Sequence, residues 1–591
     1  MPGGPIFVRE ALTAPRRPSH YLMRSGFIGA MLVLFYSIRQ ATIGFQDVQF
    51  AGDVASFSNL VFQLFAVLQL TLGMFFATLF TASNIAQEKD RQTLILLLMT
   101  DMRNHELALG KLMSSLLVVV VLVGASLPVF ASLRLLGGIT WSQIIWVEAI
   151  IATASLAAGT WGGMVAFWRE KTFQTLAISV LGVVIFLSVV EGLASGIGGP
   201  TGAQIGQLSP YRSMMAVLNP MTTVQSGVAE VSALSTVAIL LGLSAGLSVY
   251  TILRLRTWNP SQQLRQSALQ SVETSESSEE TVGQEPVPAS PRHHRTVWNN
   301  PVIWREMRTR AYGRKVGWIK LVYALLVVML AWSTLSVTSL SDQQELVLGM
   351  VGPAAFSFIG VGIISLLLMN AQAVTSITNE RDGRTLEPLL ITDLSAKEFM
   401  LAKIGGAMWN AREMIILPLI FLVTMATMQS VTTLSVENLV YVIAAYLVLS
   451  LFAVSLGLHA GLTYDNSRSA IGNSLGTMFF LFIGIFIFML LLVEARSSFF
   501  IQIQSFIVFI GFGSLGLYSS LTHKNPSNAL TLASMVLPFL TFYGITDFLL
   551  GGSLGVCFWI CVAYGFASIA MLVPAMTDFD VALGRNTQDV G

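Results

Sequence analysis

The sequence has little charge. Only 11% of its 591 residues are Asp, Glu, Lys or Arg, whereas soluble proteins average about 25%. Hydrophobic residues make up 54% of the chain, and the mean hydropathy is +0.70. So few charges cannot cover several globular cores with a solvated surface. The composition therefore excludes a string of soluble domains and predicts a chain that mostly faces lipid.

The chain also has a net charge of only +1 and only two cysteines. Its 33 Lys and Arg balance its 32 Asp and Glu, so no overall field would attract nucleic acid. Cys557 and Cys561 lie in one apolar run, and we interpret them as buried small hydrophobes rather than a disulfide or a metal site. No zinc spacing, dinucleotide loop, catalytic cluster or phosphate-binding Gly-x-x-x-x-Gly-Lys-Ser/Thr loop is present. These absences argue against an enzyme and predict no cofactor or metal in this chain.

What the sequence does have is a series of apolar runs of about 20 residues, the length that crosses a bilayer as a helix. The first half has six, at 27–45, 57–81, 112–136, 144–168, 173–193 and 231–253. The second half has six more, at 319–340, 346–370, 404–428, 439–463, 472–493 and 554–573. Two further apolar stretches, 499–521 and 530–550, leave both 12 and 14 spans open.

Lys and Arg are concentrated in the loops on one side of these spans, as at Arg16, Lys111 and Arg169, whereas the opposite loops carry acids such as Asp53. Positive loops lie in the cytoplasm. We therefore expect cytoplasmic N- and C-termini and a location in the bacterial cytoplasmic membrane. The first span is expected to remain uncleaved, because no convincing small-residue signal-peptidase site follows it.

A polar loop occurs twice. Residues 85–111 and 377–403 match without a gap at an offset of 292, with 12 of 27 residues identical. An even number of spans separates the copies, so both loops emerge on one face, unlike the inverted repeats of many secondary transporters. The identical pairs include Glu88 and Glu380, Asp90 and Asp382, Thr93 and Thr385, Leu97 and Leu389, and Lys111 and Lys403.

A second match precedes the first span of each half, where Arg9 and Glu10 correspond to Arg305 and Glu306. The predicted fold is thus an all-α polytopic membrane protein of two parallel six-span repeats, with 12 core spans or 14. The units are residues 1–256 and 297–591. The Ser-, Glu- and Pro-rich segment 257–296 between them is expected to be a disordered cytoplasmic linker.

Each repeated loop is predicted to form a pair of helices. Thr93 and Thr385 are suitable N-caps for a short leucine-rich helix. Ser395 and Glu398 form a capping box for the second helix, which continues into the next span. The leucines either pack into the membrane interface or form a docking surface for a cytoplasmic partner. We favour docking because both halves keep the same charged and apolar residues.

At these residues the sequence resembles the ABC-2 family of ATP-binding-cassette transporter permeases. The matching signature is Glu, a basic residue, an acidic residue, Thr-Leu, Leu-Leu, Thr-Asp and Lys, over 88–111 and 380–403. The segment with Asn300, Arg305 and Glu306 is also similar to that family. The chain departs from the family pattern by fusing two units, and its C-terminal part matches least.

The resemblance implies a permease that works with a separate cytoplasmic ATPase, expected in two copies, which would carry the ATP and Mg. The ATPase is expected to bind the loops at 84–111 and 376–403. Alternatives are an ATP-independent carrier or channel, and a scaffold that anchors an ATPase. By resemblance, the coupling surface comprises Glu88, Asp90, Thr93, Leu97, Lys111, Glu380, Asp382, Thr385, Leu389 and Lys403, and the segment leading into the membrane comprises Arg9, Glu10, Arg305 and Glu306.

Polar residues inside spans are candidates for a transport pathway. Asn59 and Gln63 lie one turn apart on the second span. Glu413 lies deep in its span beside Arg412, and adjacent residues point about 100° apart on a helix, so we expect the two not to pair and one to face the bundle interior. Glu148 and Glu191 lie toward outer helix ends, where snorkelling to the interface is the simpler expectation. The substrate is not specified by these residues; lipids, drugs, peptides and glycans all fit.

Overall fold

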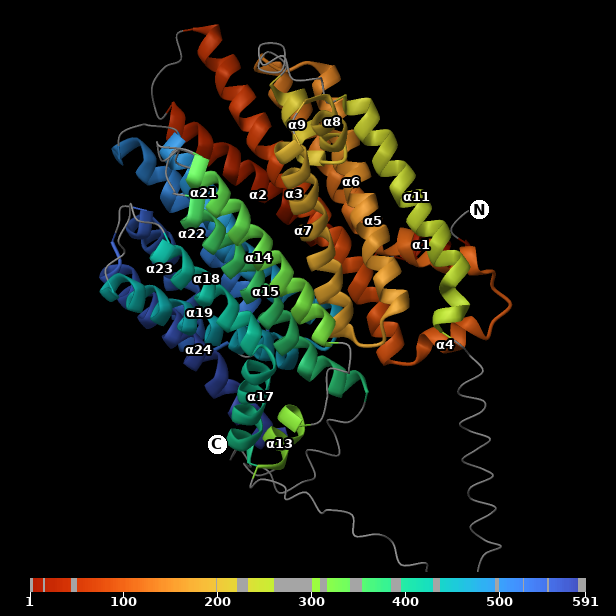
Figure 1. The fold of residues 1–591 in the computed structure, drawn as a ribbon, viewed down its shortest axis with the longest axis vertical. Helices are drawn as coiled ribbons and strands as arrows, with labels where there is room; N and C mark the ends of the chain where they lie inside the picture. The colour runs from red at the N-terminus through yellow and green to blue at the C-terminus, as the bar shows by residue number, and fades with distance from the viewer. Residues whose placement is uncertain are drawn as a thin grey trace, which may run out of the picture.

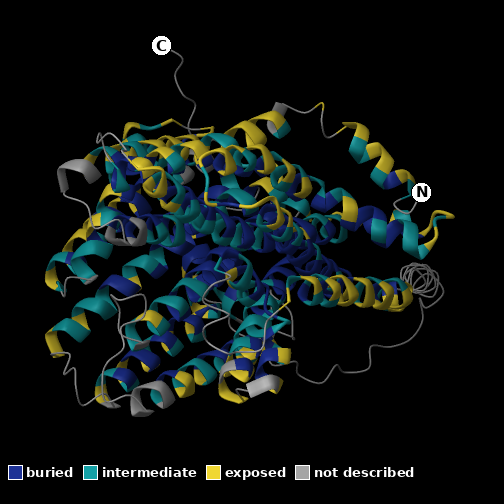
Figure 2. Cartoon of the chain, turned by 90° about the horizontal axis from the view of Figure 1, so that it is seen from above, coloured by how far each residue is buried: buried dark blue, intermediate teal, exposed yellow. Residues whose placement is uncertain are grey.

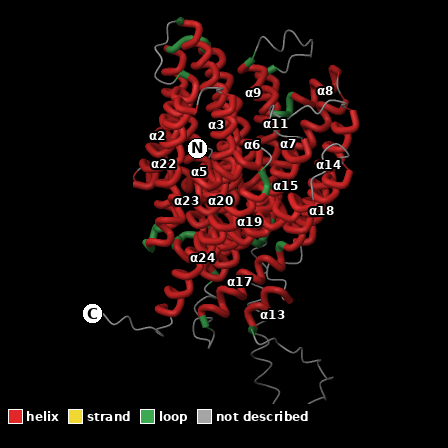
Figure 3. The backbone as a smooth tube through the Cα atoms, turned by 90° about the vertical axis from the view of Figure 1, so that its left-hand side faces the viewer, coloured by secondary structure: helices red, strands yellow, loops and turns green. Residues whose placement is uncertain are grey.

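The structure is a computed structural model. It describes residues 4–13, 16, 18–43, 50–197, 199–219, 232–259, 300–308, 316–340, 353–383, 395–428, 436–494, 499–524, 526–549 and 552–582. Every regular element in these ranges is a helix, and none is a strand (Figure 3). The prediction of an all-α membrane protein is confirmed.

The six predicted spans of the first half each correspond to one long helix. The longest, with 40 residues, measures about 60 Å at 1.5 Å per residue, so it extends beyond a hydrocarbon core of about 30 Å. The helices of this half are α1 (Gly4–Thr13), α2 (Pro18–Thr42), α3 (Ala51–Asp90), α4 (Thr93–Leu98), α5 (Asn104–Leu135), α6 (Trp141–Trp168), α7 (Thr172–Ile197), α8 (Gly199–Gly206), α9 (Pro210–Leu218) and α11 (Ala233–Trp258).

The second half contains more long helices than the first. Its π-helical turn η2 continues α20 into α21, so these three form one span. The elements are α13 (Pro301–Arg308), α14 (Val316–Leu340), α15 (Pro353–Asp382), α17 (Ala396–Asn410), α18 (Arg412–Met428), α19 (Val436–Thr463), α20 (Ser467–Phe479), η2 (Phe480–Gly484), α21 (Ile485–Glu494), α22 (Phe499–Leu521), α23 (Asn528–Leu549) and α24 (Leu554–Ala582).

Two boundaries differ from the prediction. The expected span 404–428 is broken at Ala411, where α17 and α18 meet at 51°. The helix α11 continues to Trp258, into the predicted linker, and the rest of that linker lies outside the described residues. The described residues contain 13 helices long and apolar enough to cross a membrane, or 14 if the bent pair is one span. Both additional stretches, α22 and α23, are helices of this kind, which favours 14 spans over 12.

The two halves of the chain lie side by side (Figure 1). The helix α14 packs against α7, and α22 packs against α2, where the buried Ser505 hydroxyl donates to the carbonyl of Ser37 at 2.7 Å. Buried residues lie in the middle of the bundle, whereas exposed residues lie on its rim (Figure 2). The rim includes large apolar side chains such as Leu32, Val120 and Trp332. An apolar rim on a bundle of long apolar helices indicates a multi-pass membrane protein.

Close helix contacts occur at glycines in both halves. A Cβ on Gly162 of α6 would lie 2.8 Å from the carbonyl oxygen of Thr78 on α3, and one on Gly457 of α19 would lie 2.7 Å from that of Asn370 on α15. Small residues let helix backbones approach in membranes, where packing rather than hydrophobicity drives association. The second and fourth long helices of each half are therefore held together in the same way. They fix the positions at which α3 and α15 end.

Candidate functional site

The repeated motif lies at one end of the bundle, called here the loop end, where α3 and α15 finish and α5 and α17 begin. Glu88 pairs with Lys111 of α5, and Glu380 pairs with Lys403 of α17 at 2.8 Å. Both lysines are buried, Lys403 to 1% exposure. A buried ammonium group needs a neutralising partner. Each glutamate therefore holds the end of one long helix against the start of the next.

The short helix α13 adds to this pairing in the second half. Glu306 pairs with Lys403 at 2.7 Å, and Arg305 pairs with Glu380. Two carboxylates and one guanidinium thus surround the buried lysine. The segment predicted to lead into the membrane is joined directly to the repeated motif.

In the first half the corresponding helix α1 packs against α5. Arg9 pairs with Glu10 at 3.2 Å. Gly4 has a φ of 58°, and a Cβ there would lie 3.0 Å from the Cβ of Glu106. The glycine therefore permits both the left-handed backbone and the close approach of α1 to the first turn of α5.

The basic residue of the motif binds a helix C-terminus. Lys89 donates to the carbonyl of Phe167 in the last turn of α6. Arg381 donates to the carbonyl of Gly461 in the last turn of α19 at 3.0 Å. Carbonyls in a last turn lack partners within their helix and carry partial negative charge. A cation at this position both donates hydrogen bonds to these carbonyls and neutralises their partial charge.

The aspartate of the motif binds a helix N-terminus. Asp90 accepts a hydrogen bond from the hydroxyl of Thr172, the first residue of α7, and Asp382 accepts one from Ser467, the first residue of α20. An anion is stabilised at this end of a helix dipole. The Glu, cation, Asp motif therefore fastens the end of α3 or α15 to three other helices.

We call this set of contacts the clamp; it comprises residues 88–90 with Lys111 and Thr172, and residues 380–382 with Lys403 and Ser467. It was not predicted from the sequence, which suggested a surface for a partner. One feature of the sequence does point to such contacts. In both copies a basic residue is followed by an aspartate at the end of a long helix, and these are the charges that bind the C-terminus of one helix and the N-terminus of another.

The two parts of the clamp are joined through Arg91, the residue that follows the first of them. Arg91, directly after α3, pairs with Asp382 at 3.2 Å across the boundary between the halves. Nearby, the guanidinium of Arg468 lies 5.3 Å from the ring centre of Phe80, a cation–π distance. The motifs of both halves therefore form one connected site at the loop end.

The prediction that Thr93 is an N-cap is wrong by one residue. Gln92 occupies the cap position with a φ of 57°, and Thr93 is the first residue of α4. Only two residues join α3 to α4, so the chain turns through a left-handed residue rather than an extended cap. The Thr93 hydroxyl instead donates to the carbonyl of Glu88 at 3.2 Å. Its counterpart Thr385, and Leu389, lie outside the described residues.

The helix α4 has one face turned inward and one outward. Leu94 and Leu98 are buried, and Leu97 is half-buried. Leu96 and Met99 are 65% and 72% exposed. Leu96 and Met99 are therefore the most exposed apolar side chains of this helix, whereas the predicted Leu97 is only partly exposed. The predicted capping box of Ser395 and Glu398 at the start of α17 is confirmed.

Two of the three candidate pathway residues, Gln63 and Glu413, take part in separate contacts. Gln63 donates to Asn219, which follows α9, at 2.8 Å. Asn59 lies one turn earlier on α3 and is half-buried. Glu413 lies at the start of α18 and pairs with Lys320 of α14 at 2.6 Å. Their contacts do not indicate one shared polar path.

Arg412 and Glu413 do pair, at 3.2 Å, contrary to the expectation from helix geometry. They form the first turn of α18, directly after the break at Ala411, where their long side chains can meet. The Arg412 guanidinium also lies 4.6 Å from the ring centre of Trp409. Arg412 is exposed and Glu413 is half-buried, so neither is an isolated interior charge.

The snorkelling expectation is wrong for Glu148. This residue is buried in α6 and accepts a hydrogen bond from Ser126 at 2.8 Å, while Gln69 donates to Ser126 at 2.7 Å. Glu191 is bonded to Arg212 of α9 at 2.6 Å. Both acids therefore hold helices together within the chain.

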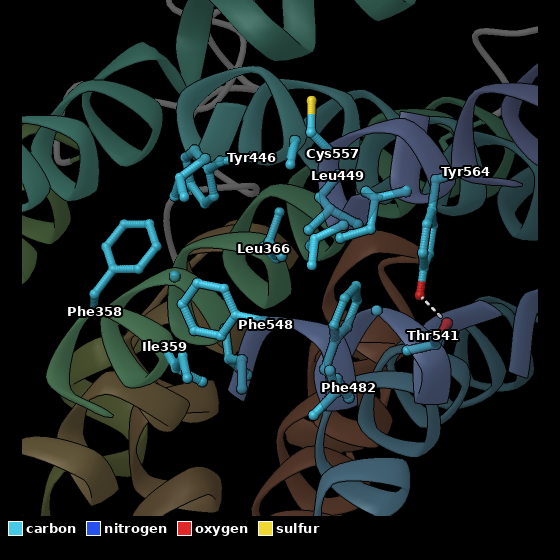
Figure 4. A pocket seen from close by; sticks show the side chains of 18 of the residues that line it. Phe358, Ile359, Leu366, Tyr446, Leu449, Phe482, Thr541, Phe548, Cys557 and Tyr564 are labelled. Carbon is cyan, nitrogen blue, oxygen red and sulfur yellow. Dashed lines mark hydrogen bonds between the residues drawn. The ribbon is translucent and has the colours of Figure 1, made fainter. Parts of the chain in front are cut away.

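The described helices enclose several cavities, of which three hold more than about 100 Å³. The first, of about 180 Å³, is bounded by α15, α19, α23 and α24 and lined by aromatic rings such as Phe358 and Tyr446 (Figure 4). Two of its polar groups bond to each other, the hydroxyls of Thr541 and Tyr564, at 2.5 Å. Two larger cavities, of about 840 and 980 Å³, lie where helices of the two halves meet. Within the described residues, no three His, Cys, Asp or Glu side chains are placed to hold a metal ion.

No family model, curated protein or solved structure matches this chain. A functional assignment must therefore be supported by its own residues and their contacts.

Proposed function

We propose that the chain is the membrane-spanning permease subunit of an ABC transporter, an exporter driven by ATP hydrolysed on a separate cytoplasmic ATPase. The loops at 84–111 and 376–403 would be the sites to which two copies of that ATPase dock. The supporting observation is the clamp, which ties each repeated loop to several long helices at once.

The contacts of the clamp would allow a movement of the ATPase at the loop to be passed to the membrane helices. Movement of α4 would be passed directly to α3 and α5, because Glu88 and Lys111 join the two helices on either side of it. The pair between Arg91 and Asp382 would carry part of the movement into the second half. Rigid helices that share such contacts move as bodies rather than bending locally.

The proposal includes an orientation. The loop end would face the cytoplasm of a bacterium, with both termini on that side, because the basic loops lie there. ATP and Mg would be bound by the partner. Membrane lipid would surround the rim, and no nucleic acid would be involved.

The test is the association of the chain with an ATPase in membranes of its source cells. The tagged chain is purified with the double substitution Leu96→Glu and Met99→Glu, and ATP hydrolysis in the eluate is measured. Both side chains are exposed, so the change should spare the fold. Hydrolysis that co-purifies with the unmodified chain and is lost in this variant would support the proposal.

The matched control is Phe50→Glu with Leu135→Glu, two exposed apolar residues at the opposite end of the bundle. It should leave the association intact. Charge reversal of Glu88 and Glu380 is less suitable, because both are paired within the chain and their loss would disturb the fold. A chain that transports substrate in vesicles without any ATPase would be a carrier or channel. One that binds an ATPase and moves nothing would be a scaffold.

A further inference from the structure

The larger cavity between the halves ends at a buried arginine. Its volume is about 980 Å³, within the range of about 300 to 1,000 Å³ typical of ligand sites. The helices α6, α7, α11 and α14 line it, almost entirely with apolar side chains. Arg169, which follows α6, is the charged residue in this lining, and it is 8% exposed.

The backbone of Arg169 is fixed, whereas its side chain is not paired with an anion. Its amide donates to the carbonyl of Val165 at 2.8 Å, and its carbonyl accepts from Lys89 at 2.9 Å. Its Nε is buried without a hydrogen-bond partner. No carboxylate among the described residues forms an ion pair with Arg169, and its neighbour Glu170 is exposed.

A buried guanidinium without an anion is unfavourable, because burial removes its hydration without supplying a neutralising charge. Burial alone lowers the pKa of Arg169, yet an arginine stays charged at neutral pH. The ring of Trp168 lies 3.6 Å from the guanidinium carbon. Stacking covers one face of the guanidinium plane and leaves its N–H groups, which point outward at the edge, available to an anion.

The cavity has the depth and the surroundings of a lipid site. From Arg169 its lining continues along α6 to Ala154, a length of about 20 Å at 1.5 Å per residue, which exceeds the roughly 15 Å of hydrocarbon in one leaflet. Trp168, which stacks on the arginine, and Trp318, which lines the same cavity, are both exposed. Tryptophan is enriched at the level of lipid headgroups, so this end of the cavity matches the membrane interface.

We propose that this cavity binds an anionic phospholipid, with an acyl chain between α7, α11 and α14 and the phosphate on the guanidinium of Arg169. Basic pockets between membrane helices bind acidic lipid headgroups in this way, and a guanidinium can hold a phosphate through two parallel hydrogen bonds. Because α14 belongs to the second half, the lipid would also fill the boundary between the halves. The site does not depend on the chain being a permease.

The test is native mass spectrometry of the purified chain with phosphatidylglycerol or phosphatidylcholine carrying the same acyl chains. We expect tighter binding of phosphatidylglycerol, and about tenfold weaker binding of it in Arg169→Gln, the factor expected for a lost charge-assisted hydrogen bond. Arg169→Lys should keep part of the preference, because an ammonium still attracts phosphate. The matched control is Lys171→Gln, which removes an exposed cation two residues away and should leave binding unchanged.

A second variant tests the apolar part. Leu243→Trp places a larger ring in the cavity from α11 and should reduce binding of both lipids, with Arg169 still present. Three results would overturn the proposal: no preference for the anionic lipid, an equal loss in Lys171→Gln, or displacement of the lipid by millimolar inorganic phosphate. Equal melting temperatures of the variants without lipid would show that a loss of binding is not a loss of fold.

Discussion

Arg91 and Asp382 form an ion pair of 3.2 Å although they lie 291 residues apart in the chain. Arg91 directly follows α3, and Asp382 is the last residue of α15. These are the second long helices of the two halves. Asp382 is nearly buried, with 4% of its side chain exposed, and it also accepts a hydrogen bond from Ser467. The two repeated motifs are therefore connected to each other as well as to their own helices.

The first prediction concerns this pair. Arg91→Ala and Asp382→Asn should each lower the stability of the chain, and the double variant should be more stable than the sum of the two effects implies. We expect a coupling free energy of about 1 kcal/mol, the upper part of the range for exposed pairs, because one partner is buried. Thermal unfolding of the four proteins in one detergent measures it. Strictly additive effects would mean that the halves are not joined at this point.

Most of the fold could be predicted from the sequence, because a span requires a long apolar run and little else. The break at Ala411 could not. Neither proline nor glycine occupies that position, and the charged first turn of α18 is stabilised by Lys320 on another helix. The break at Ala411 therefore depends on contacts with other helices, which the sequence around Ala411 does not reveal.

The candidate site was predicted only in part. The repeated loop was identified, but the role of Glu88 could not be determined, because a glutamate can equally face a partner or its own lysine. That choice depends on which helices are neighbours. The proposed lipid-binding role of Arg169 was missed for the same reason, since the burial of a loop arginine is not visible in sequence.

The second prediction concerns the buried lysine of the clamp. Lys403→Met should lower stability by about 3 kcal/mol, the lower part of the range for a broken buried pair, because Arg305 alone is then left to neutralise both Glu306 and Glu380. Adding Glu306→Gln should restore part of the loss. Lys397→Met, an exposed change on the same helix, is the control and should have little effect. Similar melting temperatures for both lysine variants would contradict the pairing.

The third prediction concerns orientation. In a background with Cys557 and Cys561 replaced by alanine, Met99→Cys should react with a membrane-impermeant maleimide only after the cells are opened. Leu135→Cys, exposed at the opposite end of the bundle, should react in intact cells. Labelling is read on gels from the mobility of the modified chain. The reverse pattern would place the loop end outside the cell, where ATP could not drive it.

The fourth prediction tests the packing that positions the ends of α3 and α15. In Gly457→Ala the new methyl group would lie 2.7 Å from the carbonyl oxygen of Asn370 and 2.9 Å from the amide nitrogen of Val374, so the backbone of α15 would have to move away. Overpacking of this kind costs about 1 to 3 kcal/mol. The control is Gly476→Ala in α20, where nothing lies within 4 Å of the new methyl group and the gain in helix propensity should stabilise by up to about 1 kcal/mol. In thermal unfolding followed by tryptophan fluorescence, Gly457→Ala should have a lower melting temperature than the unmodified chain, and Gly476→Ala a higher one. If Gly457→Ala were as stable as Gly476→Ala, α19 would not approach α15 as closely as described, and the clamp residues Glu380, Arg381 and Asp382 would lose the support that fixes their positions.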